Sequence, residues 1–355
     1  MTNDLSRKTV VIPAARLPVL AQADVIVAGG GNAGFIAAVA ASRSGARTIL
    51  VERYGYLGGS LTATYAASPG FFGDAEGRQV IAGLGWEYVE RMEKAKAAIV
   101  DRNTWNVQIF PEATKSVALE MLIEAGVELY LHAWACETLV EEGIIRGVIV
   151  QSKSGRSVIQ GKVFVDATGD ADLASLSGAP CEKLPPDQLW QTSVDLVVCN
   201  VDAEKVIQWA KVNEDRVIWM SMPECINPSD IQPMVSLIIQ TEHEPQEGEV
   251  DHVGPVPTVK LMIHPGISRV QGSVEVDGTD VRGLTYAEIE ARRRAEAHLA
   301  YLKATVPGYE NALIVGECHL GVRETRRITG EYVLTIDDLL SQRRFEDVVA
   351  LNCRP

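Results

Sequence analysis

Two short apolar runs flank an Ala-rich segment near the N-terminus. Residues 25–28 are Val, Ile, Val and Ala, a wholly apolar run that is typical of a strand buried on both faces. The Ala-rich residues 33–44 predict a helix, and residues 47–51 predict a second buried strand. The order strand, helix, strand predicts a βαβ unit built on parallel strands.

The turn between the first strand and the helix is rich in glycine. Gly29, Gly31 and Gly34 have the spacing G-x-G-x-x-G, with Asn32 and Ala33 between the last two. Such glycines permit a tight turn, the close approach of a pyrophosphate, and close packing of the helix on the strand. The helix N-terminus then offers free N–H groups and its positive dipole end to phosphates.

An acid stands at the end of the second strand. Glu52 follows Gly29 by about 20 residues, where a carboxylate can accept both hydroxyls of an adenosine ribose. An acid rather than a basic residue favours FAD or NAD over NADP, because it would repel a 2′-phosphate. The alternative interpretation is a glycine-rich turn in an ordinary βαβ unit.

Helices and strands continue to alternate as far as residue 165. Periodic apolar positions predict helices at 79–98 and 111–123, the second opened by a proline and followed by a glycine. Apolar runs predict strands at 127–134, 148–150 and 158–165, with a hairpin at 138–145.

The pattern changes at about residue 181. Strands are predicted at 190–201, 256–263 and 268–276, and a helix at 202–212. Thr285 and Glu288 form a capping box that predicts the start of a long helix ending near Ala304. Residues 222–257, rich in Pro, Glu and Asp, predict a loop or lid, and residues 313–315 a strand that returns to the first domain.

We therefore predict an α/β fold of two domains. A Rossmann-like nucleotide-binding domain, with a parallel sheet, helices and a small β excursion, would comprise residues 1–180 and 310–355. A smaller, β-rich substrate domain would comprise residues 181–309. The 355 residues are enough for two domains of ordinary size.

Charge and cysteine spacing exclude several classes of protein. A net charge of −14 disfavours binding to nucleic acid or to an anionic membrane surface. The six cysteines include no C-x-x-C pair, and the histidines share no metal-ligand spacing, so neither a metal nor a dithiol site is predicted. The polar N-terminus is no signal peptide, and residues 25–41 fall short of the ~20 that a membrane span needs. We expect a cytoplasmic protein with reduced cysteines.

Four segments in this order resemble the FAD-dependent oxidoreductases of the glutathione-reductase-like two-domain superfamily. They are residues 24–31, 52–59, 165–170 and 321–328. Within that superfamily they are similar to a bacterial group related to the fumarate-reductase-like flavoproteins. The resemblance extends from about Leu17 to the end of the chain and implies FAD, but no particular substrate.

The resemblance also implies which residues contact the cofactor. The glycine turn would hold the pyrophosphate, Glu52 the adenosine ribose, and the segment after the second strand the adenine and the flavin. For Asp170, capping of a helix N-terminus is an equal alternative. The implied contacts are Gly29, Gly31, Asn32, Ala33, Gly34, Glu52, Arg53, Gly58, Gly59, Ser60, Ala135, Thr168, Gly169 and Asp170.

An Arg-rich motif supplies the candidates for substrate contact. Arg323, Arg326 and Arg327 would share one face of a helix, where their guanidinium groups could hold a carboxylate or stabilise a reduced flavin. The alternative is a basic face paired with neighbouring glutamates. His319 could exchange a proton near neutral pH, and its alternative is a structural histidine.

The sequence departs from the family near its end. The family's late strand-loop-helix, whose helix N-terminus faces the flavin, has a similar segment here at 311–316, but that segment precedes the Arg-rich motif. We therefore expect the sequence to be truncated relative to its relatives, with weakened flavin binding.

These observations predict an FAD-dependent oxidoreductase that transfers a hydride between flavin and a small organic substrate, a carboxylate included. Two alternatives stay open: an NAD-dependent dehydrogenase, and a non-catalytic nucleotide-binding or subunit protein with an incomplete flavin site. The segments 53–59 and 166–170 count against the plain NAD domain. The sequence does not identify the substrate, the direction of the reaction, an electron-acceptor partner or a homo-oligomer.

Overall fold

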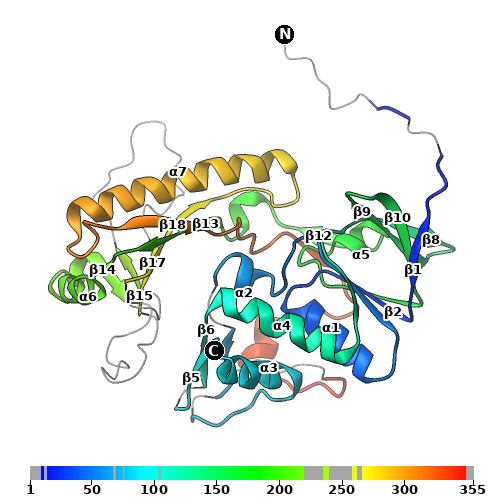
Figure 1. Ribbon diagram of the computed structural model, residues 1–355, viewed down its shortest axis with the longest axis horizontal. Helices are drawn as coiled ribbons and strands as arrows, with labels where there is room; N and C mark the ends of the chain where they lie inside the picture. The colour runs from blue at the N-terminus through cyan, green and yellow to red at the C-terminus, as the bar shows by residue number, and fades with distance from the viewer. Residues whose placement is uncertain are drawn as a thin grey trace.

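The structure is a computed structural model with two bodies of secondary structure lying side by side (Figure 1). One body holds the N-terminal helices and a parallel sheet, and the other holds a long helix on an antiparallel sheet. The described residues are 9–11, 14–66, 69–74, 76–103, 105–219, 235–239, 258–261 and 266–348.

The first body is built on a parallel sheet with the strand order β11-β2-β3-β7. Helices α1 and α4 pack on one face, where Phe35, Leu50 and Met121 are fully buried. The apolar runs of β2 and β3 are buried on both faces, which explains why they lack alternation. The elements are β11 Val163–Asp166, β2 Val25–Ala28, β3 Thr48–Val51, β7 Glu128–Tyr130, α1 Asn32–Arg43 and α4 Pro111–Ala125.

The other face of the parallel sheet packs against a second sheet, with the order β1-β10-β9-β8. Ile26 and Ile49 meet Val148 and Ile159 there, all fully buried. Glu142 and Gly143 join β8 to β9 with φ of 51° and 77°, the positive values that a two-residue hairpin turn requires. The strands are β1 Val19–Gln22, β10 Gly155–Gln160, β9 Ile144–Ser152 and β8 Trp134–Glu141.

The remaining elements of the first body are short. A three-stranded sheet lies beside helix α3, α2 and α5 are single turns, and β12 pairs with β19. The bounds are β4 Gly70–Phe71, β6 Asn106–Ile109, β5 Ala98–Asp101, α2 Ser60–Ala63, α3 Gly83–Lys94, α5 Asp172–Leu176, β12 Cys181–Lys183, β19 Arg326–Ile328, α8 Ile336–Leu340 and η1 Pro186–Gln188. The short helix η2 Glu214–Arg216 lies in the second body, between α6 and β14.

The second body is a six-stranded antiparallel sheet with the order β14-β15-β16-β17-β13-β18. Helix α7 lies along one face so closely that a Cβ on Gly272 would stand 2.0 Å from the carbonyl oxygen of Ala291. Small residues on α7 allow this approach. The elements are β14 Val217–Trp219, β15 Val235–Ile239, β16 Thr258–Leu261, β17 Ser268–Val274, β13 Thr192–Cys199, β18 Leu313–Glu317, α6 Ala203–Val212 and α7 Val281–Thr305.

The predicted fold class is confirmed, since a parallel sheet with helices stands beside antiparallel sheets. The predicted start of the long helix is wrong. Asp280 caps α7 by accepting a hydrogen bond from the N–H of Gly283 at 2.8 Å, whereas the hydroxyl of Thr285 donates back to the carbonyl of Val281. The helix therefore begins one turn earlier than the capping box indicates.

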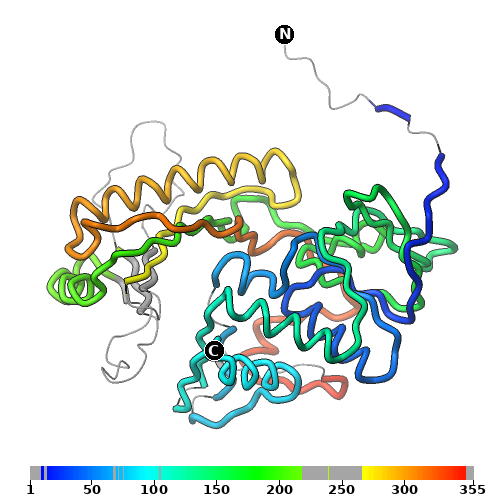
Figure 2. The backbone as a smooth tube through the Cα atoms, viewed as in Figure 1, coloured from blue at the N-terminus to red at the C-terminus, as the bar shows by residue number. Residues whose placement is uncertain are grey.

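The expectation that residues 313–315 return to the first domain is also wrong. They form β18, which pairs with β13 at the edge of the six-stranded sheet, and the chain crosses to the first body only after it (Figure 2). The division at residues 180 and 310 stays a prediction. The predicted loop at 222–257 lies outside the described residues except for 235–239, which form β15.

A buried cation joins the two bodies. Arg269 on β17 forms an ion pair with Asp195 on β13, and their side chains are only 2% and 5% exposed. The same guanidinium donates to the carbonyls of Tyr65 and, at 3.2 Å, of Thr64, just beyond α2. Burial lowers the pKa of Arg269 to about 10, so the group stays charged at neutral pH. The six-stranded sheet is thereby fixed to the C-terminal end of α2.

We expect Arg269→Met to lower the free energy of unfolding by about 3–5 kcal/mol, because Asp195 would remain buried without a counter-charge. Adding Asp195→Leu should recover part of the loss. Arg156→Met, which breaks an exposed pair with Glu137, is the control and should cost at most about 1 kcal/mol. Urea unfolding measures all of these, and equal losses for Arg269→Met and Arg156→Met would contradict the assignment.

Candidate functional site

Two backbone segments touch at the glycine turn. A Cβ on Gly34 would lie 1.8 Å from the carbonyl oxygen of Gly29, and a Cβ on Gly29 would lie 2.3 Å from that of Ala167. Gly29 also has a φ of 99°, which side chains disfavour. Helix α1 can therefore approach β2 and the end of β11 only because both positions are glycine.

The N-terminus of α1 has no partner of its own. Gly31 is the N-cap and supplies no side chain, and the first turn contains no acid. Among the described residues, the buried Oδ1 of Asn32 has no hydrogen-bond partner. The free N–H groups and the positive dipole end fit an anionic group such as a pyrophosphate, whereas the Oδ1 is an acceptor that needs a donor.

A second pair of glycines faces this turn. The N–H of Gly58 donates to the carbonyl of Gly30 at 2.9 Å, and a Cβ on Gly59 would lie 2.8 Å from the Cα of Gly31. Helix α2 begins at Ser60 directly afterwards, again without a side-chain cap. The two turns form a cradle of backbone in which side chains would clash.

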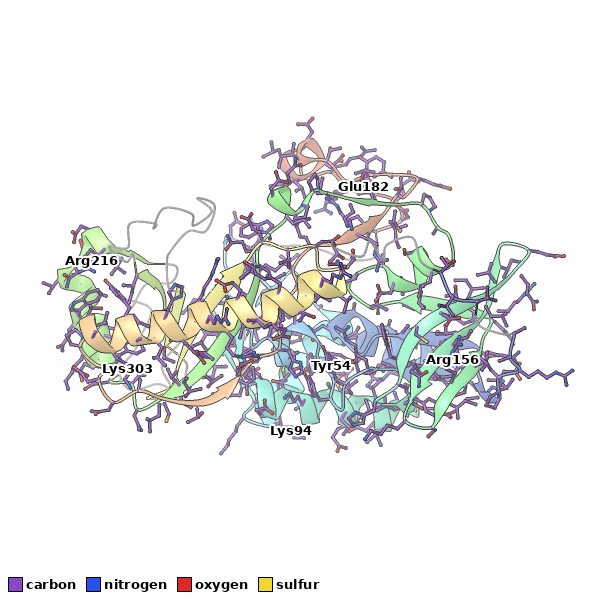
Figure 3. All side chains as sticks on the ribbon, turned by 90° about the horizontal axis from the view of Figure 1, so that it is seen from above. Tyr54, Lys94, Arg156, Glu182, Arg216 and Lys303 are labelled. Carbon is purple, nitrogen blue, oxygen red and sulfur yellow. The ribbon has the colours of Figure 1, made fainter. Side chains whose placement is uncertain are left out.

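Glu52 is held in one orientation beside the cradle. Its carboxylate is 8% exposed and accepts hydrogen bonds from the N–H of Gly30 at 2.6 Å and of Tyr54 at 2.8 Å. Arg53, the next residue, places its guanidinium 4.8 Å from the centre of the Tyr54 ring. In the view of Figure 3, the label of Tyr54 stands between helix α7 and the sheet that carries Arg156.

The loop after β11 is tied down by its own side chains. Asp166 accepts hydrogen bonds from the hydroxyl of Thr168 at 2.7 Å and from the N–H of Ala174 at 2.9 Å. Gly169 has a φ of 91°. Asp170 accepts from the hydroxyl of Thr325 at 2.7 Å, and the N-cap of α5 is Ala171, so helix capping by Asp170 is not what the structure shows.

Ala135 belongs to the interior rather than to a surface. It lies on β8, 7% exposed, in the apolar cluster between the parallel sheet and the β8–β10 sheet. Its backbone pairs with Val150 of β9.

The Arg-rich motif does not form the predicted helix. Arg326 lies on strand β19 and is bound to the first body, through an ion pair with Asp172 and hydrogen bonds to Ser175 and the carbonyl of Asp170. Burial and the neighbouring Asp170 raise the pKa of Asp172, although the ion pair with Arg326 acts to lower it. Arg323 is exposed, 5.7 Å from the ring centre of Trp190. The motif is extended because β19 pairs with β12.

His319 lies apart from both arginines, where the two bodies meet. Its ring packs edge-on against Tyr54 and Tyr56, with centroids 4.8 and 5.7 Å apart. Its backbone N–H donates to the carbonyl of Ala63, the last residue of α2, at 2.9 Å. Among the described residues, its ring nitrogens bond no protein group. The three predicted side chains therefore have different partners: the tyrosines for His319, Trp190 for Arg323 and Asp172 for Arg326.

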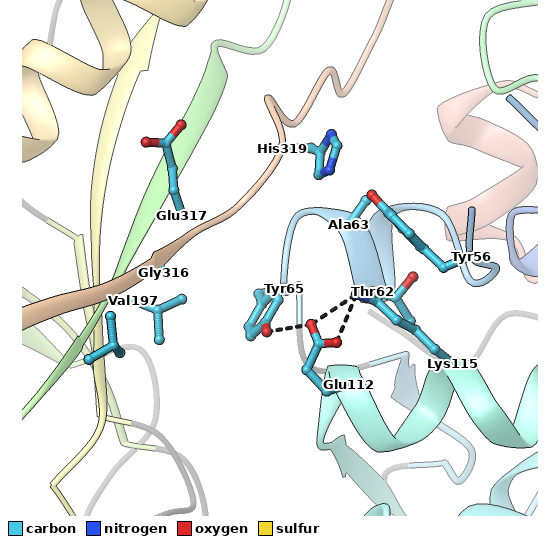
Figure 4. Close-up of a pocket in the computed structure, with 11 residues that line it drawn as sticks. Tyr56, Thr62, Ala63, Tyr65, Glu112, Lys115, Val197, Gly316, Glu317 and His319 are labelled. Carbon is cyan, nitrogen blue, oxygen red and sulfur yellow. Dashed lines mark hydrogen bonds and ion pairs between the residues drawn. The ribbon is translucent and has the colours of Figure 1, made fainter. Parts of the chain in front are cut away.

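His319 stands at the edge of a cavity of about 280 Å³ (Figure 4). One wall consists of α2 with Tyr56, and another of α4. The opposite wall is the six-stranded sheet, through Val197 and residues 315–317. Thr62 and Ala63 lie within one turn of helix, about 6 Å, of the cradle at Gly59. The cavity therefore opens beside the glycine turns.

Four polar side chains of this cavity were not predicted from the sequence. The hydroxyl of Tyr65 donates to Glu112 at 2.6 Å, and the ammonium of Lys115 donates to both oxygens of Glu112 at 2.8 and 2.9 Å (Figure 4). Tyr56 completes the set, with the Lys115 ammonium 4.2 Å from its ring centre. Tyr56 closely precedes the second glycine pair in the sequence. Of the four residues, it is the one to which a sequence motif pointed.

Metal and disulfide chemistry find no site in the described part of the chain. It holds no group of three or more His, Cys, Asp or Glu side chains placed to bind a metal ion. Its cysteines, Cys136, Cys181, Cys199 and Cys318, are free, and Cys225 and Cys353 lie outside it. Among the described helices, none combines the length and the apolar character that a membrane crossing requires.

A family model described as FAD dependent oxidoreductase matches residues 24–355. The chain belongs to this family. Its cofactor is therefore FAD, and the glycine cradle at the uncapped N-terminus of α1 fits the pyrophosphate of such a dinucleotide. Because the family is one of FAD-dependent enzymes, membership favours an oxidoreductase over both the NAD-dependent and the non-catalytic alternatives.

Several solved structures align with most of this chain. A geranylgeranyl bacteriochlorophyll reductase-like protein from Thermoplasma acidophilum is 14% identical, with a TM-score of 0.46 over 84% of this chain and 66% of that chain. The p-nitrophenol 4-monooxygenase of Pseudomonas putida DLL-E4 is 14% identical, with a TM-score of 0.44 over 84% and 67%. The myxobacterial chondrochloren halogenase is 14% identical, with a TM-score of 0.48 over 88% and 64%. This chain spans about two thirds of each, and likeness at this level says nothing of its substrate.

We expect Glu52→Gln to raise the dissociation constant of FAD about 10- to 100-fold, because a charged hydrogen-bond acceptor contributes about 1.5–3 kcal/mol. Glu120→Gln, an exposed position on α4, is the control and should leave the constant unchanged. Titration of the cofactor-free protein with FAD, followed by flavin fluorescence, measures both. Equal affinities for the wild type and Glu52→Gln would remove Glu52 from the cofactor site.

Proposed function

We propose that the cradle and its surroundings hold FAD in the way that the sequence predicts. Gly31, Asn32 and Gly59 would approach the pyrophosphate, since no side chain stands between the two turns. Glu52 would accept the ribose hydroxyls, because its carboxylate is already oriented by two backbone N–H groups. We also propose that the chain is related to the fumarate-reductase-like flavoproteins.

The substrate would be a small organic molecule in the cavity at the far end of α2. FAD, when bound, supplies the uptake or release of a hydride. The chain supplies the rest: the six-stranded sheet closes the cavity from one side, and α2 with α4 encloses it from the other. The observation that carries this proposal is that cavity and cradle share one four-residue helix.

His319 is the proposed acid or base of the reaction. It lines the cavity, it is exposed, and its backbone is fixed to α2 by the hydrogen bond to Ala63. Two tyrosine rings hold the imidazole from one side. The group is thus positioned by the protein while its nitrogens stay available to a ligand, as proton exchange requires.

The arginines support a carboxylate substrate less well. Neither Arg323 nor Arg326 lines the cavity, and the guanidinium of Arg326 is already bound to Asp172. Their role as substrate contacts stays a prediction, for which the exposed guanidinium of Arg323 is the better candidate.

We expect His319→Gln to slow substrate-driven reduction of bound FAD about 10²- to 10⁴-fold, because a positioned acid or base contributes that factor. The FAD-loaded protein is mixed without oxygen with a panel of small alcohols, amines and hydroxy acids, and the loss of flavin absorbance is timed. Dithionite reduction is the control and should be the same in both proteins. A substrate that reduces wild type and variant equally fast would remove His319 from catalysis.

A further inference from the structure

The charges around the cavity are all paired. Lys115, the one cation among the described lining residues, is bound to both oxygens of Glu112. Although burial acts to raise it, the pKa of Glu112 is held below its usual value by the hydrogen bonds from Lys115 and Tyr65. Glu317 is paired with Arg292 of α7, which lies outside the lining. Neither an anion nor a cation would meet a free counter-charge here.

One polar group of the cavity lining is unsatisfied. The hydroxyl of Tyr56 is buried, and none of the residues that the structure describes forms a hydrogen bond with it. Leaving a buried hydroxyl unsatisfied costs about 1–3 kcal/mol, which a bound molecule can offset by supplying the missing hydrogen bond. Burial raises the pKa of Tyr56 well above its usual value, so the phenol stays protonated. Its O–H group can therefore donate a hydrogen bond to a ligand.

The backbone of the cavity wall just beyond α2 is strained. Tyr65 has a φ of 52°, a conformation that is costly for a residue with a side chain, by about 1–3 kcal/mol. Its hydroxyl is held by Glu112 and its carbonyl by Arg269, so both ends are fixed from different bodies. Strain maintained in this way is typical of ligand sites rather than of plain packing.

The size of the cavity limits the ligand. A volume of about 280 Å³ lies just below the ~300–1,000 Å³ found for small-molecule sites, and the cavity is open to solvent beside the exposed His319. The ligand is therefore a small molecule rather than a large ring system.

We infer that the cavity binds an uncharged small molecule through one oxygen, a hydroxyl or a carbonyl, held between the Tyr56 phenol and the His319 imidazole. The inference rests on the proposed function, because it names the substrate class of the same site. The arginines predicted a substrate with a carboxylate. The inferred substrate is instead a neutral alcohol, and its product is the carbonyl compound.

For an alcohol the step balances without a further reactant. The O–H bond would break and its proton would pass to a ring nitrogen of His319, while the C–H bond would break with loss of a hydride. FAD, when bound, would supply the acceptor for that hydride, so the alcohol would become the carbonyl compound. Tyr56 donates a hydrogen bond to the oxygen throughout, and this bond orients the reacting carbon.

Propane-1,2-diol and lactate form a matched pair of probes, since they differ in a hydroxymethyl group against a carboxylate. Each is titrated into the FAD-loaded protein while the ring proton NMR signals of the six histidines are recorded. The His319 signal is assigned by its loss in His319→Gln. We expect the diol to shift it saturably and lactate to leave it in place.

Tyr56→Phe tests the contact itself. This substitution should raise the dissociation constant of the diol about 2- to 10-fold, which is the effect of losing one neutral hydrogen bond. Tyr286→Phe is the control, because this tyrosine is 53% exposed on α7 and does not line the cavity.

Three results would overturn the inference: a shift of His319 by lactate but not by the diol, no saturable shift by either, or equal diol affinity in Tyr56→Phe. Flavin reduction separates this inference from the proposed function. A diol that binds at His319 but never bleaches the flavin would uphold the neutral site and defeat the hydride reaction. Bleaching by lactate alone would uphold the reaction and defeat the neutral class.

Discussion

The contact between the backbone of Gly29 and that of Gly34 is the constraint on which the cofactor site depends. It brings the N-terminus of α1 against the ends of β2 and β11, with no room for a Cβ at either glycine. The uncapped N–H groups of α1 are thereby aimed into the space that Gly31 and Gly59 leave open. Every proposed contact with FAD is placed by this one crossing of main chains, and Glu52 is oriented by the N–H of Gly30 within it.

The second body acts on the site through α2. One end of this short helix is the glycine cradle, and just beyond its other end lie the carbonyls held by the buried guanidinium of Arg269. Since Arg269 and Asp195 belong to the six-stranded sheet, sheet, helix and cradle are fixed in one arrangement. The cavity lies between α2 and the six-stranded sheet, which explains why its walls come from both bodies.

The sequence predicts those parts that depend on neighbours along the chain. The strands β2 and β3, the helix α1 and the glycine turn follow from apolar runs and glycine spacing, and the structure has them nearly where the pattern places them. Glu112 and Lys115 are neighbours on α4, but Tyr65, just beyond α2, meets Glu112 only in three dimensions, so this cluster could not be found in the same way. Arg326 was misplaced for the same reason, since pairing of β19 with β12 overrides a local helical pattern.

The most direct test of the account is the visible absorption spectrum of the purified, folded chain before and after addition of FAD. The account predicts that the flavin bands shift on binding, that they saturate at one FAD per chain, and that dithionite bleaches the bound flavin. A chain that is folded by circular dichroism but leaves the spectrum of added FAD unchanged would contradict the cradle as a cofactor site.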